Sequence, residues 1–509
     1  MKRELLVVFV AAVALYVPTA RYGIVQDDRA IVAANPAAHS IGAALAAFDD
    51  PYWPRESGAG LYRPITILSY AVDWTISGGR IGWLHLMNAV WHGLAAMLLV
   101  AVLSRWLPTL AAAGAGLVFA WHPVHVEAVA SLVGRAELLV AVGILGAVLA
   151  ARRGWWAAAV VCAGLAMFSK EHGVIAGVVI LLDKWLEGDS TRSYPAGLWI
   201  GLGFVTAAFL VAWTLIGRTG ASDVAAVFYG RGALGRWAIA LPAVARAALL
   251  LIWPVSLSAD YGPRVIPPYS SLSLAAVMGG AVIVALPVLI VGYRRRAPAL
   301  AFAAAVAGLS YLPTANLLFP SGVVLAERSL YLAVALPAAL VGSAFSRLAL
   351  RYAIRPAALG LTVLALVCGA LSLGRLPSWR GNRTQLLTLL VEHPESYRAH
   401  ASAAAVLAGS GDTAGVRRQY RLADSLFAGD PYLDAAHAIF LLGISDTASA
   451  APLIARLRAR SDGRADLVAL RAQFLFEWRR GNRTAAVALA DSARRRYPAD
   501  TGWYGVYLQ

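Results

Sequence analysis

Two adjacent carboxylates, Asp27 and Asp28, lie a few residues beyond the first long apolar segment, in the sequence QDDRAI. Two acids at the mouth of a membrane helix cost solvation energy if they are buried, and they contribute little to the helix if they are exposed. A carboxylate beside a cavity can instead act as a general base toward a hydroxyl group. From spacing alone, a solvated turn or an ion pair with Arg29 explains the two acids equally well.

Arginines that could bind an anion follow further along the chain. Arg63 precedes a proline in GLYRPIT, and Arg328 follows Glu327 at the start of an apolar segment. The planar guanidinium group suits a phosphate, and an unpaired arginine at a membrane boundary is costly. Arg328 is therefore expected to meet an anionic lipid headgroup, whereas Arg63 could equally anchor its helix in the interface.

The densest group of polar residues is the segment HPVHVEAVASLVGRAE, with His122, His125, Glu127 and Arg135. Two histidines and a glutamate could ligate a divalent metal, although their spacing differs from the HExxH pattern of zinc sites. The same side chains could instead donate hydrogen bonds to a phosphate or a sugar. Both interpretations stay open from the residues alone.

Two further segments carry polar side chains at expected helix positions. His92 shares one face of a helix with two other polar residues in HLMNAVWH, so this face either lines a cavity or bonds a neighbouring helix. The segment SKEHG supplies three more candidates at a helix end: Lys170, Glu171 and His172. A local ion pair is the alternative explanation for the SKEHG residues.

These clusters must be positioned by membrane helices. The chain has 509 residues, of which 14% are charged, and a mean hydropathy of +0.65, whereas soluble domains carry about 25% charged residues. The formal net charge is +16, but the arginines concentrate in short loops and in the tail. The positive-inside rule explains the loop arginines without a nucleic-acid partner.

Residues 1–375 are predicted to form an all-α bundle of about eleven membrane spans. The spans are expected at 5–20, 83–103, 109–121, 137–151, 155–168, 173–186, 196–216, 271–292, 299–318, 326–345 and 356–375. A further apolar stretch, 237–256, contains Pro242 and Arg246. Basic loops alternate correctly only if this stretch is re-entrant or interfacial, which also puts the loop 21–82, the polar clusters and the tail on one extracytoplasmic side.

The tail, residues 376–509, is amphipathic and arginine-rich and contains no apolar span. Small-residue turns at Gly411, Gly443 and Gly481 recur at intervals close to the tetratricopeptide period of about 34 residues. About three such repeats would form an α-helical domain with a concave surface for an extended peptide. An ordinary helical domain is the alternative.

Six sequence blocks resemble the transmembrane and tetratricopeptide-repeat O-mannosyltransferases, the TMTC family. The blocks are DDRAI, YRPIT, HLMNAVWH, FAWHPVHVEAVASLVGRAELL, SKEHG and NLLFPSGVVLAERSLYL, in the order of that family. The resemblance covers most of residues 20–345 and implies a GT-C glycosyltransferase fold. It also implies an inverting transfer of mannose from a polyprenyl-phosphate donor to serine or threonine hydroxyls of a protein acceptor.

The resemblance implies that the catalytic acid lies in the first outer loop, as Asp27 or Asp28, and Asp27 is the expected base. The other candidate residues named above are then expected to bind the donor and its phosphate. No cofactor is required, although a divalent metal stays possible. The arginine and alanine bias suggests a GC-rich bacterial genome, and hence the bacterial inner membrane and an undecaprenyl- or decaprenyl-phosphate donor.

Three other functions agree with parts of the sequence. A lipid-linked sugar flippase would also line a cavity with polar residues, but transporters of this kind have repeated halves, and the chain has no such internal symmetry. A glycosyltransferase could use a lipid or glycan acceptor instead of a protein. A non-catalytic scaffold would account for the tail but not for acids and bases on one side of the bundle.

Overall fold

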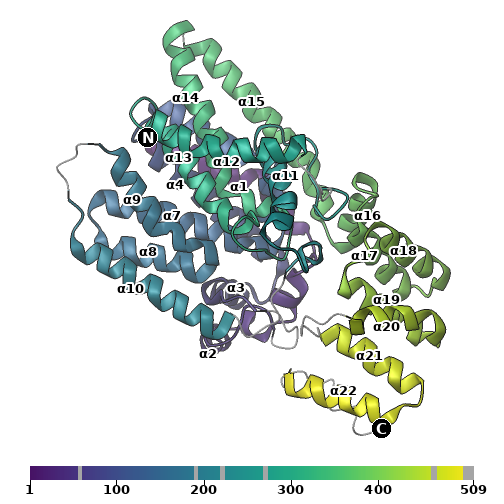
Figure 1. Cartoon of the computed structure of the whole chain (residues 1–509). Helices are drawn as coiled ribbons and strands as arrows, with labels where there is room; N and C mark the ends of the chain where they lie inside the picture. Colours follow the sequence, from purple (N-terminus) through teal and green to yellow (C-terminus); the bar gives the residue numbers. More distant parts are fainter. Residues whose placement is uncertain are drawn as a thin grey trace.

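The computed structural model describes residues 1–54, 60–188, 193–217, 224–266, 273–352, 354–459 and 467–496, so 55–59 of the first loop and 497–509 of the tail lie outside the described residues. Throughout the described ranges the regular structure is helical (Figure 1). The helices of the membrane domain are α1 (Lys2–Tyr16), α2 (Ile41–Ala46), α3 (Pro64–Ser77), α4 (Ile81–Leu103), α5 (Thr109–Trp121), α6 (His125–Ala130), α7 (Arg135–Arg153), α8 (Trp156–Ser169), α9 (Ala176–Leu186), α10 (Ala196–Ala212), α11 (Ala233–Ile252), α12 (Leu274–Tyr293), α13 (Pro298–Tyr311), α14 (Ala335–Tyr352) and α15 (Ile354–Arg375).

Within the described residues, eight helices are long and apolar enough to cross a membrane. They are Lys2–Arg21, Ile81–Leu103, Leu132–Arg153, Ala196–Gly217, Ala233–Ile252, Leu274–Tyr293, Leu332–Tyr352 and Ile354–Trp379, and shorter apolar helices occupy Thr109–Trp121, Trp156–Ser169 and Pro298–Thr314. All of these helices except Ala233–Ile252 coincide with predicted spans. The remaining predicted span, 173–186, is occupied by α9. The prediction of an all-α polytopic membrane protein is confirmed.

Helix α7 is the central helix of the bundle, because 89% of its spanning segment is buried. Small residues allow its neighbours to approach closely: a Cβ built on Gly143 would lie 2.8 Å from the Cβ of Ala166 on α8. Close packing of small side chains is the usual way in which membrane helices associate. Since α7 begins with Arg135 and Glu137, its burial places both ionisable side chains inside the protein.

Helix α11 is the stretch predicted not to cross the membrane. It is one continuous helix of 20 residues with Pro242 inside it, and its length and composition would allow a crossing. Near its N-terminal end, the side chains of Arg236 and Trp237 both donate to the carbonyl of Leu317, which follows α13. Beyond its C-terminal end, the backbone N–H of Ser258 donates to Glu327, which lies ten residues after Leu317 in the sequence. This placement agrees with an interfacial helix, which stays a prediction.

The tail forms α16 (Asn382–Glu392), α17 (Tyr397–Gly409), α18 (Thr413–Leu426), α19 (Pro431–Gly443), α20 (Thr447–Ala459), α21 (Leu467–Arg479) and α22 (Arg483–Arg496). Helices α17, α19 and α21 begin 34 and then 36 residues apart, and each forms a hairpin with the helix that follows it. Asp412, Asp446 and Asn482 each accept a backbone N–H at the start of the second helix. The regular spacing fits the predicted repeats, and the tetratricopeptide assignment stays a prediction.

One turn of the tail differs from the sequence interpretation. Gly411 and Gly481 adopt the positive φ expected of turn glycines, at 79° and 78°. In the middle hairpin the residue with positive φ is Ser445, at 62°, because Gly443 still belongs to α19. The tail lies on the same side of the bundle as the loop that follows α1, since the N–H of Gly23 donates to the carbonyl of Arg380 at 2.9 Å. Figure 1 shows α2 and α3 at the lower end of the membrane domain, and the tail helices running down the right side of the molecule, away from the N-terminus.

Candidate functional site

The structure gives the two adjacent carboxylates different environments. They lie in the loop between a 3-10 turn (Val17–Arg21) and a π turn (Arg29–Ala33). Asp28 is completely buried, and its Oδ2 accepts the N–H of Val25 at 3.0 Å. Its Oδ1 accepts the N–H of Val133 at 2.9 Å and the hydroxyl of Ser131 at 3.2 Å. Burial raises the pKa of Asp28 to about 6, although these hydrogen bonds oppose the shift.

Asp27 is the accessible member of the two. Its side chain keeps 36% of its surface exposed, and its Oδ2 lies 3.9 Å from Nη2 of Arg328. Arg328 also faces Glu127, whose Oε1 lies 3.4 Å from Nη1 and whose Oε2 accepts the backbone N–H of Arg328 at 2.9 Å. Both ion pairs of Arg328 are long, so its guanidinium group retains capacity to bind an additional anion.

Two further cations lie close to Arg328, each with a carboxylate partner. Arg63 donates to both oxygens of Glu171, at 2.8–3.2 Å, and stacks over the ring of Tyr52. Lys170 forms an ion pair with Glu137. Burial lowers the pKa of Lys170, Glu137 raises it, and the positive charges of Arg63 and Arg328 lower it again. The three cations therefore lie within electrostatic reach of one another.

The third residue of SKEHG, His172, faces the same acid. Its Nε2 lies 3.4 Å from Oε2 of Glu137, and burial lowers its pKa to about 4 despite the attraction of that carboxylate. At neutral pH the imidazole is uncharged, so His172 supplies a hydrogen bond rather than a fourth positive charge. Beside Arg63, a cavity of about 200 Å³ is lined in part by Tyr52 and Trp53.

The remaining predicted histidines serve the packing of the helices. The ring of His92 contacts the hydroxyl of Tyr331 at 2.7 Å and a carbonyl of α5. Nε2 of His125 faces the carbonyl of Tyr331 at 3.0 Å, and Nε2 of His122 faces a carbonyl of α11 at 3.2 Å. A ring nitrogen that donates to a carbonyl cannot ligate a metal. In the described part of the chain, no three His, Cys, Asp or Glu side chains lie together as a metal site would need.

Arg135 is also an internal support. Its guanidinium group is fully buried and bonds Oδ2 of Asp73 at 2.5 Å, Oδ1 of Asn88 at 2.7 Å and the carbonyl of Leu84 at 2.8 Å. It also stacks over the ring of Tyr70. With its donors engaged by α3 and α4, Arg135 ties these two helices to α7 and has no surface to offer a ligand.

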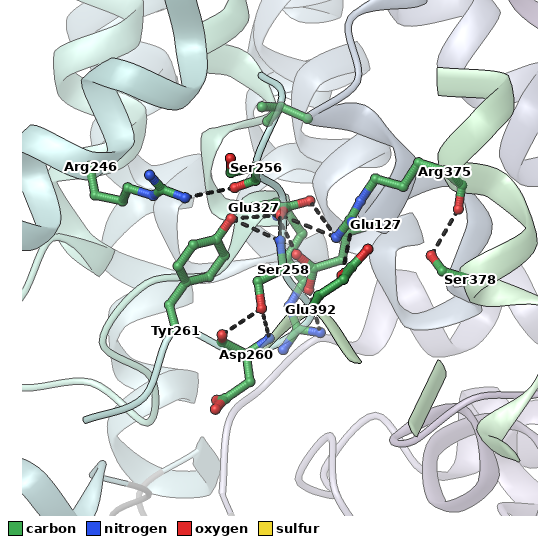
Figure 2. Close-up of polar contacts among 12 residues, drawn as sticks. Glu127, Arg246, Ser256, Ser258, Asp260, Tyr261, Glu327, Arg375, Ser378 and Glu392 are labelled. Carbon is green, nitrogen blue, oxygen red and sulfur yellow. Dashed lines mark hydrogen bonds and ion pairs between the residues drawn. The ribbon is translucent and has the colours of Figure 1, made fainter. Parts of the chain in front are cut away.

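Glu327 occupies the joint between the membrane domain and the tail (Figure 2). It is completely buried, and its Oε1 accepts the N–H of Ser258 at 2.6 Å and the hydroxyl of Tyr261 at 2.7 Å. Nη2 of Arg375, at the end of α15, lies 3.3 Å from the same oxygen. Burial raises the pKa of Glu327 to about 7, and Arg375 opposes that shift. Its role in the structure is to hold the root of the tail.

Most of the supporting residues were missed by sequence reasoning; Glu137 ends the predicted polar segment HPVHVEAVASLVGRAE, but no partner was predicted for it. Asp73 and Glu137 are the buried partners of Arg135 and Lys170, and Arg375 and Tyr261 are partners of Glu327. An acid or arginine within or at the end of an apolar helix is a usable signal, since it requires a partner. Nothing in the sequence shows which partner that is.

The structure thus brings together Asp27, Arg63, Lys170 and Arg328 from four separate segments of the chain. An accessible carboxylate beside three cations can accept a proton while the cations stabilise negative charge on a neighbouring group. The buried Asp28 holds the loop that presents Asp27. This combination suits the displacement of an anionic leaving group by a hydroxyl.

Three relatives show what the chain is similar to. Over 133 residues it is 38% identical to "Protein O-mannosyl-transferase Tmtc2" of Drosophila melanogaster, a match that covers 25% of this chain and 14% of the relative. It is 31% identical to "Protein O-mannosyl-transferase TMTC3" of Homo sapiens, with 26% of this chain and 15% of the relative covered. A longer match, 24% identical over 432 residues, covers 82% of this chain and 62% of "Protein O-mannosyl-transferase F38B6.6" of Caenorhabditis elegans.

The chain covers less than two thirds of the length of each of these relatives. No family profile matches it, and no solved structure is significantly similar to it. The short matches are the more identical ones, whereas the match to the nematode protein extends over most of the chain. These matches confirm the resemblance indicated by the six sequence blocks: the chain is similar to proteins of the TMTC family.

Proposed function

We propose that this protein is an inverting glycosyltransferase that moves a sugar from a polyprenyl-phosphate donor to a serine or threonine hydroxyl of a protein. The observation that carries this proposal is the accessible carboxylate of Asp27, 3.9 Å from Arg328, a cation that lies within electrostatic reach of Arg63 and Lys170. The names of the relatives support mannose as the sugar and a protein as the acceptor.

In the proposed reaction, Asp27 accepts the proton of the acceptor hydroxyl as its oxygen attacks the anomeric carbon. The new carbon–oxygen bond forms on the face opposite the bond that breaks, so the configuration of the sugar inverts. The electron pair of the broken bond stays on the phosphate oxygen. Because a phosphate is a stable anion, its departure needs no general acid, unlike the leaving group of a glycoside hydrolase.

Arg328 is the proposed main contact of the donor phosphate, because its ion pairs are the longest of the three cations. Arg63 and Lys170 are each held by a closer carboxylate and would contribute mainly through their charge. Such preorganised charges stabilise the leaving phosphate in the transition state more than the bound donor. Asp28 would act indirectly, by fixing the loop that carries Asp27.

The proposed location of the reaction depends on which side of the membrane bundle carries Asp27 and the tail. The tail contacts the first outer loop, so an acceptor held by the tail would lie on the side of Asp27. We place this side outside the cytoplasm, in the bacterial inner membrane, from the charge pattern and the composition of the chain. A divalent metal is not part of the proposed mechanism.

Purified protein in detergent or in liposomes is incubated with radiolabelled polyprenyl-phosphate-mannose and a pool of serine- and threonine-containing peptides. The expected result is transfer of label to peptide with inverted anomeric configuration, determined by NMR of the glycopeptide. Movement of labelled lipid across liposomes without transfer would indicate a flippase. Transfer to lipid or glycan alone would overturn the protein acceptor, and neither activity would favour a scaffold. Parallel reactions with and without EDTA test metal dependence.

A further inference from the structure

The root of the tail binds the loop that presents Asp27. The backbone N–H of Gly23 donates to the carbonyl of Arg380 at 2.9 Å. Three residues further on, the N–H of Gln26 donates to Oδ1 of Asn382 at 2.6 Å. Asn382 is the first residue of α16 and lies more than 350 positions from its partner in the sequence. These contacts connect the tail directly to the residue that precedes Asp27.

The backbone at Gln26 needs such a contact. Its φ of 45° lies in the left-handed region, which residues other than glycine avoid because their Cβ crowds the following carbonyl. A strained residue of this kind persists only when its surroundings hold it. On the other side of Asp27, the buried Asp28 is fixed by three hydrogen bonds. The direction of the Asp27 carboxylate is therefore set between two anchors, Asn382 and Asp28.

Asn382 can act as an anchor because the root of the tail is itself held in place. Arg375, at the end of α15, bonds the buried Glu327 (Figure 2). Beyond α16, Oδ2 of Asp260 accepts the hydroxyl of Ser396 at 2.7 Å, and Oδ1 of Asp260 lies 3.6 Å from Arg398. Contacts on both flanks of α16 thus join the tail to the membrane domain, and Asn382 lies between them.

We propose that Asn382 is a positioning residue for catalysis, through which the tail holds the base Asp27 in its reactive orientation. This inference rests on the proposed glycosyltransferase function. The side-chain oxygen of Asn382 bonds the backbone of Gln26, whereas the three cations bond carboxylates. Its loss should therefore lower kcat, which depends on the orientation of the base, and leave the KM for the donor unchanged.

The test compares wild-type protein with Asn382→Ala, Gln26→Gly and the double variant. Asn382→Ala is expected to lower kcat on the order of tenfold, because it removes one anchor of a strained residue. Glycine adopts a positive φ without strain, so Gln26→Gly should restore most of the lost kcat in the Asn382→Ala background. Asn482→Ala is the matched control, since Asn482 also accepts a backbone N–H at a helix start but lies in the last hairpin.

A second measurement does not depend on activity. Hydrogen exchange of the peptide that contains Gln26 should accelerate in Asn382→Ala and not in Asn482→Ala, while melting temperatures check that both variants fold. Unchanged kcat in Asn382→Ala, or failure of Gln26→Gly to restore it, would overturn the positioning role. An unchanged exchange rate would refute the contact itself. Absence of sugar transfer by the wild-type protein would instead refute the proposed function, whatever the exchange data show.

Discussion

The most informative perturbation is the replacement of each of the two adjacent carboxylates by its amide. Asp27→Asn removes a charge from a side chain that is 36% exposed and whose nearest ion-pair partner is 3.9 Å away. Asp28→Asn places an amide where both carboxylate oxygens accept hydrogen bonds. The two changes are chemically identical, so a difference in outcome reports only on the environment of each residue.

The expected magnitudes differ accordingly. Without its general base, Asp27→Asn should lower kcat by about 10²- to 10⁴-fold, and its stability should change by no more than about 0.5 kcal/mol. Donor binding should tighten by at most about fivefold, because an exposed ion pair is worth about 1 kcal/mol or less. In Asp28→Asn, the amide nitrogen would face a backbone N–H or the Ser131 hydroxyl. One unpaired donor should cost about 1–3 kcal/mol of stability.

The assay measures single-turnover transfer of labelled mannose, donor affinity and thermal unfolding for both variants and the wild-type protein. The expected pattern is an inactive but stable Asp27→Asn and a destabilised Asp28→Asn with partial activity. Near-normal turnover of Asp27→Asn would refute its role as the base. Loss of turnover in a stable Asp28→Asn would show that the buried carboxylate is the base. Solvent exposure would then be the wrong criterion for choosing between the two acids.

Three further predictions concern the cations, the joint and the packing. Arg328→Gln should raise the donor KM at least tenfold with little change in stability, and an unaltered KM would place the phosphate elsewhere. Burial raises the pKa of Glu327 above its value in the unfolded chain, so the wild-type protein should lose stability as the pH rises from about 4.5 through 7. Glu327→Gln should remove this pH dependence, as measured by thermal unfolding scans at pH 5 and 8. Gly173→Ala should destabilise by about 1–3 kcal/mol, since its Cβ would lie 2.3 Å from the backbone of Ala166, whereas Gly177→Ala, which has open space, should be neutral in the same melts.

Much of the fold could be predicted from the sequence. Long apolar runs identified the spans, because a membrane helix must satisfy every backbone hydrogen bond internally and present apolar side chains to lipid. The turns at Gly411 and Gly481 identified two hairpins of the tail, since glycine adopts positive φ without strain. Ser445 escaped prediction because a serine at positive φ has no comparable sequence signal.

The candidate site could be predicted only in part. Residue type and sequence position indicated that Asp27, Arg63, Lys170 and Arg328 are chemically capable and lie near one side of the membrane. The same reasoning grouped them with Arg135, whose three guanidinium nitrogens all bond groups within the protein. An arginine that is buried as an internal support and one that is accessible to a ligand cannot be told apart by residue type. Local sequence does not show which side chains surround each of them.

By itself, the sequence determined the class of the protein and its resemblance to the TMTC family. It also determined which ionisable residues need a partner inside or beside a membrane helix. Only the tertiary structure decided how Asp27 and Asp28 differ, because their burial depends on Ser131 and Val133, about a hundred residues away. It also decided that Asn382 meets the loop of the two acids. The physical reason is that pKa, accessibility and backbone strain depend on neighbours in space, which the order of residues does not specify.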